Sequence, residues 1–67
     1  MRIENIYTPH ERDIITGVAS LLNIPFTVSE SYNEPFHVFN IDIDVKPRYK
    51  DTLTTCINKA LIIANEL

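Results

Sequence analysis

Residues that could act as nucleophiles or metal ligands are few in this chain. It contains one cysteine, Cys56, and two histidines, His10 and His37. A zinc cage of four Cys and His ligands needs more of these side chains, and a lone thiol cannot form an internal disulfide. Cys56 lies on the apolar side of a predicted helix, where we expect a small buried hydrophobic group and not a nucleophile. We therefore expect no catalytic residue, no metal, no cofactor, and hence no enzyme.

Carboxylates provide the first candidate binding surface. Between Arg12 and Lys46 the chain has acidic residues but no lysine or arginine. Asp42 and Asp44 stand about 7 Å apart along a predicted strand, which is long for chelating one cation without further oxygen ligands. Neutral threonine or serine would suit exposed strand positions better, so we expect these acids to contact a basic protein surface. The expected acidic face comprises Glu30, Glu34, Asp42 and Asp44.

The basic residues Lys46, Arg48 and Lys50 cluster at the start of the last predicted helix. Free backbone N–H groups at a helix start favour anions, so this cluster is a candidate anion site. The alternative is that the three bases neutralise neighbouring carboxylates. Nucleic-acid affinity depends on many phosphate contacts, whereas this chain has a net charge of −3. We therefore expect no direct binding of nucleic acid.

Large apolar residues also fall on the outward faces of predicted elements. A chain of 67 residues buries only about 60% of the surface that its unfolded form exposes, so its core is marginal. Several exposed apolar residues that form one patch are typical of a protein interface. We expect a homodimer or larger assembly that uses Tyr32, Phe36, Val38 and Ile62.

The elements that position these residues follow from periodicity. Residues 2–7 predict a short edge strand. Residues 8–11, Thr-Pro-His-Glu, are typical of a helix start, with a hydroxyl N-cap, proline at the first position and glutamate closing a capping box. Apolar residues recur at helical spacing as far as Leu22. Gly17 lies inside this helix and costs about 1 kcal/mol relative to alanine, unless another backbone packs closely there.

A β-hairpin and a second helix follow. Residues 24–30 and 36–45 alternate apolar and polar side chains around a polar turn, which predicts two antiparallel strands. Phe36 and Val38 have the same parity as Asp42, so the outward face becomes apolar near the turn unless a bulge resets the register. From residue 46 onward, apolar residues fall on one side of a helix, with Ile62 on its polar side.

These elements predict an α+β fold. It is a two-layer sandwich in which an antiparallel β-hairpin, with the N-terminal strand as an optional third member, carries two helices on one face. No linker interrupts residues 1–67, so we expect a single domain. There is no apolar run of roughly 18 residues and no signal-peptide pattern, so we expect no membrane contact and a cytoplasmic location.

Together these features favour a non-enzymatic protein-binding module. In size and charge alone the chain resembles small acidic phage-encoded proteins that inhibit host nucleases and polymerases. That resemblance implies a viral protein that occludes a larger host enzyme, with an acidic face that mimics nucleic acid. The alternative is a structural homodimer or assembly module without a foreign target.

Overall fold

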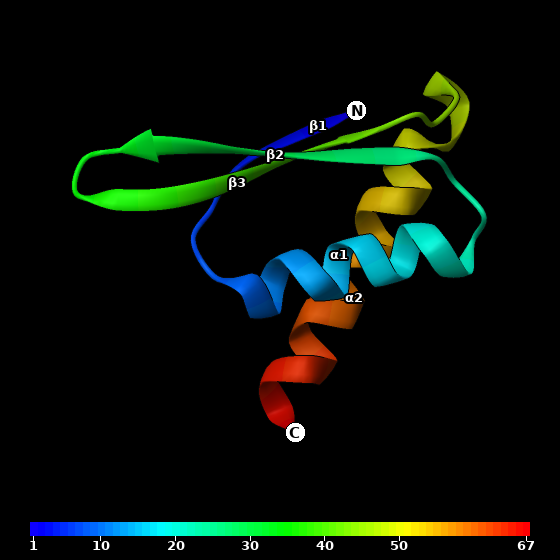
Figure 1. Cartoon of the computed structure of the whole chain (residues 1–67). Helices are drawn as coiled ribbons and strands as arrows, with labels where there is room; N and C mark the ends of the chain where they lie inside the picture. Colours follow the sequence, from blue (N-terminus) through cyan, green and yellow to red (C-terminus); the bar gives the residue numbers. More distant parts are fainter.

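The computed structural model describes residues 1–67 and has a sheet layer and a helix layer (Figure 1). A single 3₁₀ turn, Pro47–Tyr49, precedes the last helix. This architecture confirms the predicted α+β sandwich, and the optional N-terminal strand is present. The elements in chain order are β1 (Arg2–Ile6), α1 (Pro9–Leu21), β2 (Phe26–Asn33), β3 (Phe36–Ile43) and α2 (Lys50–Glu66).

The sheet is antiparallel, with β3 in the centre and β1 and β2 at its edges. β2 pairs with β3 along its full length, and Phe26 lies opposite Ile43. β1 pairs less regularly, because the register shifts between Ile3 and Ile6. Asn5 lies within this bulge and has a φ of 58°, in the left-handed region. The two edges therefore differ: β2 is long and regular, and β1 is short and bulged.

Local signals define α1 as the sequence predicts. The backbone N–H of Glu11 donates to Oγ1 of Thr8 at 3.1 Å, so Thr8 caps the helix. The helix ends at Leu21, and Asn23 has a φ of 56°, as is common just after a helix. A Cβ added at Gly17 would meet nothing within 4 Å, so no close approach of another backbone explains this glycine.

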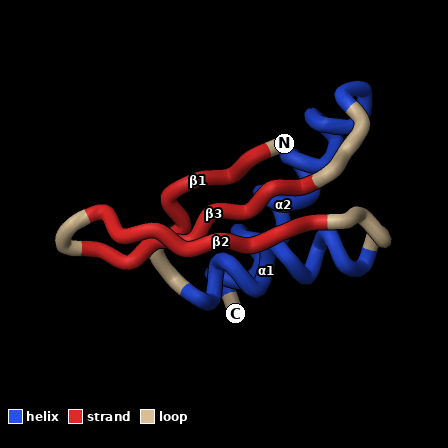
Figure 2. The backbone as a smooth tube through the Cα atoms, turned by 45° about the horizontal axis from the view of Figure 1, so that its top comes forward, coloured by secondary structure: helices blue, strands red, loops and turns tan.

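Both helices cover one face of the sheet and leave the other face without a layer (Figures 1 and 2). Only 10 of the 67 residues are buried, because a chain this short buries a smaller fraction of its surface than a longer chain does. The central cluster takes residues from both helices and from two of the strands. Its members are Ile6, Ile15, Phe39, Ile41, Ile43, Leu53 and Ile57.

Two features of the second half of the chain differ from expectation. Cys56 is exposed, so the prediction that its thiol is buried was wrong. Ile63, which helical spacing places on the same apolar side as Cys56, is 59% exposed. Ile63 lies in the C-terminal part of α2, which extends away from the sheet (Figure 1), and a helix face can be buried only where another layer covers it.

Candidate functional site

The turn end of the β2–β3 hairpin projects beyond the helix layer (Figure 1). We call residues 26–43 the hairpin. Tyr32 lies opposite His37 across the two strands, and their rings meet edge to face with centroids 6.2 Å apart. Tyr32 is 65% exposed, because neither helix reaches this end of the sheet.

The outer edge of β2 has backbone groups without partners. The backbone N–H of Asp44 donates to the carbonyl of Pro25, directly opposite, at 2.9 Å. Hydrogen-bonded and non-hydrogen-bonded pairs alternate in an antiparallel ladder, so the odd-numbered residues of β2 bond to β3. Its even-numbered residues direct their N–H and C=O groups outward, where the sheet has no further strand. These residues are Phe26, Val28, Glu30 and Tyr32.

β2 has little that protects this edge against pairing with another strand, and its one charged residue is Glu30. The sequence FTVSESYN has no proline, lysine or arginine, and its pairing with β3 contains no bulge. Natural proteins commonly block sheet edges with such features. The opposite edge, β1, has the bulge at Asn5 and the charged residues Arg2 and Glu4. β2 is therefore the more accessible edge for an added strand.

The apolar residues expected to form one interface are separated in the structure. Phe36 is 57% exposed on the open face of the sheet, where its ring meets that of Tyr7 edge to face at 5.6 Å. Tyr32 points to the helix side of the hairpin, because it lies opposite His37, which shares a face of β3 with the core residue Phe39. Val38 lies in the central strand opposite Ser31 and has no exposed surface, so its expected exposure was wrong. Ile62 is 56% exposed but belongs to α2, in the other layer.

The expected acidic face is also divided. Glu30 lies opposite the core residue Phe39 and so points to the helix side, whereas Asp42 points to the open face. The prediction that the four acids form a single face was therefore wrong. Glu34 lies in the hairpin turn and Asp44 follows β3, and both are exposed.

Asp42 is already paired within the chain. Its Oδ2 lies 2.6 Å from Nη1 of Arg2, and Nε of Arg2 lies 2.8 Å from Oε1 of Glu4. The hydrogen bond that Arg2 donates to Glu4 and the negative charge of Asp42 raise the pKa of Arg2, so the guanidinium stays charged. Part of the negative charge on the open face is therefore balanced by Arg2.

The basic cluster is exposed at the start of α2. None of the ion pairs in the structure involves Lys46, Arg48 or Lys50. No direct contact therefore supports the alternative that these bases neutralise nearby carboxylates. The guanidinium of Arg48 instead lies over the ring of Tyr49, 4.8 Å from its centroid. The cluster remains a candidate anion site.

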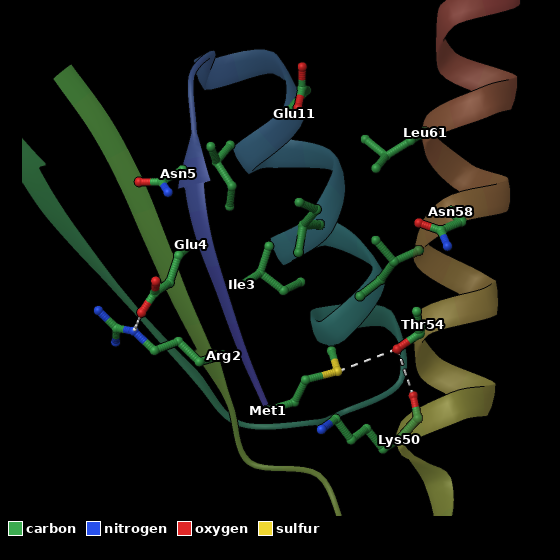
Figure 3. A pocket seen from close by; sticks show the side chains of 13 residues that line it. Met1, Arg2, Ile3, Glu4, Asn5, Glu11, Lys50, Thr54, Asn58 and Leu61 are labelled. Carbon is green, nitrogen blue, oxygen red and sulfur yellow. Dashed lines mark hydrogen bonds and ion pairs between the residues drawn. The ribbon is translucent and has the colours of Figure 1, made fainter. Parts of the chain in front are cut away.

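A groove that the sequence did not predict lies between β1 and α2 (Figure 3). Its volume is about 440 Å³. Apolar side chains such as Ile3 and Leu61 line it, and Thr54 and Asn58 stand along its helical wall. The hydroxyl of Thr54 contacts the sulfur of Met1 at 3.6 Å across one end. Thr54 and Asn58 are four residues apart and so share one side of α2, next to Leu61. This spacing was the only sequence signal for the helical wall of the groove.

A search against protein-family models, curated proteins and solved structures found no match to this chain. No group of three or more His, Cys, Asp and Glu side chains is placed to hold a metal ion. None of the helices combines the length and apolar character needed to cross a bilayer.

Proposed function

We propose that this protein is a non-enzymatic protein-binding module that binds its partner by strand addition to β2. The observation that carries the proposal is the regular outer edge of β2, which has no bulge, proline or lysine and has a row of outward N–H and C=O groups. In strand addition, these backbone groups supply affinity and alternate side chains supply specificity.

The side chains around this edge support the same function. Val28 is 42% exposed and Tyr32 is 65% exposed on the helix side of β2. Tyrosine is enriched at protein interfaces, because its ring contributes contact area and its hydroxyl can still form a hydrogen bond. Phe36 adds a second exposed aromatic group on the opposite face of the hairpin. A partner strand at β2 would therefore meet apolar side chains as well as backbone.

Charge adds a preference among foreign partners. The hairpin contains no lysine or arginine, and two of its three acids, Glu30 and Glu34, make no ion pair. A foreign partner would then carry a basic surface, and its attraction would weaken with salt. Inhibition of a larger enzyme through an acidic face alone has less support than binding at β2, because Asp42 is paired with Arg2 and Glu30 points to the other side.

Substitution of Val28 with proline tests the proposal. The N–H of Val28 points outward, so proline removes an edge donor and leaves the ladder to β3 intact. We expect Val28→Pro to reduce association, with itself or with a captured protein, by about tenfold or more while the circular dichroism is unchanged.

Val28→Thr is the matched control, because it keeps the N–H and the branched shape and should retain binding. Sedimentation and pull-down would be run on both variants and on the unsubstituted chain. Association that survives Val28→Pro, or an unsubstituted chain that stays monomeric and binds nothing, would contradict strand addition at β2.

A further inference from the structure

We infer that the partner at the β2 edge is a second copy of this chain, paired antiparallel about a two-fold axis at Ser29. This inference rests on the proposed use of β2 for strand addition. It names the occupant of that edge and the register of the pairing.

Symmetry restricts the registers that are possible. Two antiparallel strands in one sheet are related by a two-fold axis perpendicular to the sheet, so the residue on the axis faces its own copy. Both copies then present their helices on the same side, and residues of the same parity lie opposite each other. Only an axis at Val28, Ser29 or Glu30 keeps most of β2 paired, since these residues stand at its middle.

An axis at Ser29 satisfies the whole edge. Phe26 then lies opposite Tyr32 of the second copy, and Val28 lies opposite Glu30 of the second copy. These four are the residues whose N–H and C=O groups point outward, so every one of those groups finds a partner.

The two neighbouring registers are worse for identifiable reasons. An axis at Glu30 places two carboxylates directly opposite each other, which is destabilising in a sheet. It also leaves Phe26 opposite Glu34, outside the strand. An axis at Val28 leaves Tyr32 opposite Ile24, which is likewise outside β2. Charge and strand length therefore select Ser29.

Side chains fit this register on both faces. On the helix side, the exposed ring of Tyr32 gains the ring of Phe26 as a cross-strand neighbour, and aromatic pairs of this kind stabilise sheets. On the open face, Ser29 meets Ser29, and Thr27 meets Ser31 of the second copy, so only short polar groups face each other. The product is a continuous sheet formed by both copies, with neither β2 edge left free.

Disulfide trapping tests both the partner and the register. Ser29 bonds to β3, so on the axis it forms a non-hydrogen-bonded pair with itself, with Cα atoms about 4.5 Å apart. That separation lies within the range of natural disulfides, roughly 4.4–6.8 Å. In a Cys56→Ala background we expect Ser29→Cys to form a covalent dimer under mild oxidation, as seen by non-reducing electrophoresis.

Thr27→Cys and Ser31→Cys in the same background are the matched controls. Both residues are exposed, point to the same face as Ser29 and lie in the same strand. Neither faces its own copy in the proposed register, so each alone should form no covalent dimer. A mixture of the two variants should form the mixed disulfide, because Thr27 and Ser31 lie opposite each other.

The outcomes separate this inference from the proposed function. Ser29→Cys trapping no greater than that of the two controls, in protein with unchanged circular dichroism, would overturn pairing between copies at Ser29. Self-trapping at Thr27 or Ser31 would overturn the register. If Ser29→Cys fails but Val28→Pro still abolishes capture of a foreign protein, strand addition at β2 stands and the second copy does not. If Val28→Pro leaves association intact, the proposed function itself fails.

Discussion

The backbone N–H of Asn5 donates to the side-chain oxygen of Asn40 at 3.3 Å, which ties the bulge of β1 to the central strand. Asn40 is only 6% exposed, and its amide donates in turn to Oγ of Ser31 on β2 at 3.1 Å. The amide of Asn33 closes the network by donating to Oδ1 of Asn5 at 3.0 Å. Polar side chains on the open face therefore connect all the strands and hold the hairpin in place.

The left-handed conformation of Asn5 gives a first prediction. Asn5→Ala should destabilise the fold by about 1–2 kcal/mol, because alanine is strained at a φ of 58° and also loses the bond from Asn33. Asn5→Gly loses the same bond without the strain, so it should cost less. Urea unfolding of both variants measures the difference, and equal losses would show that the backbone at Asn5 is not strained.

Gly17 gives a second prediction, of increased stability. Because a Cβ at this helical position meets nothing within 4 Å, Gly17→Ala should stabilise the protein by about 1 kcal/mol. For a domain of this size the melting temperature should rise by about 4–8 °C. Ser20→Ala, at an exposed position of the same helix, is a control with a smaller expected gain. A lower melting temperature for Gly17→Ala would mean that the space beside this residue is filled.

The N-cap of α1 gives a third prediction. Thr8→Ala removes the acceptor of the Glu11 N–H and should cost about 1 kcal/mol, measured by thermal or urea unfolding. Thr8→Asp supplies another oxygen acceptor and a negative charge near the helix N-terminus, so it should retain the stability. A loss as large in Thr8→Asp as in Thr8→Ala would indicate that the hydroxyl acts through some contact other than the cap.

The acidic residues give a fourth prediction, which separates two surfaces. If association uses the β2 edge, replacing Asp42 and Asp44 together with asparagine should change neither the affinity nor its salt dependence by more than about twofold. Asp42 is paired with Arg2 on the open face and does not border the outer edge of β2. Titration at low and high salt measures this. A marked weakening of association in this variant would show that the acidic face is part of the binding surface.

Ile62 gives a fifth prediction. It is 56% exposed on α2, away from the sheet edge, so Ile62→Lys should leave both the circular dichroism and the sedimentation behaviour unchanged. A lone exposed isoleucine is common on soluble proteins. Conversion of an associating protein to monomer by Ile62→Lys would place the interface on α2 and count against the β2 edge.

Much of the local structure was determined by the sequence itself. Thr8 and Pro9 form the helix start that their types predict, because capping depends only on neighbouring residues. Alternation along Phe39, Ile41 and Ile43 predicted the strand and its buried side. These signals were sufficient for the α+β class, since an apolar face on each element must be covered by another layer.

Tertiary structure alone decided which groups are free. The pattern on α2 placed Cys56 on the apolar side with Leu53 and Ile57, and those two residues are buried, yet Cys56 is exposed. Val38 was predicted to be exposed on the outward face, and it lies on that face, yet it has no exposed surface. β1 pairs with β3 on the side away from β2, so the outer edge of β2 stays free. Strand order depends on contacts between residues distant in sequence, such as Ile3 with Ile41. Periodicity reports which side of an element is apolar, whereas exposure depends on where the neighbouring elements begin and end.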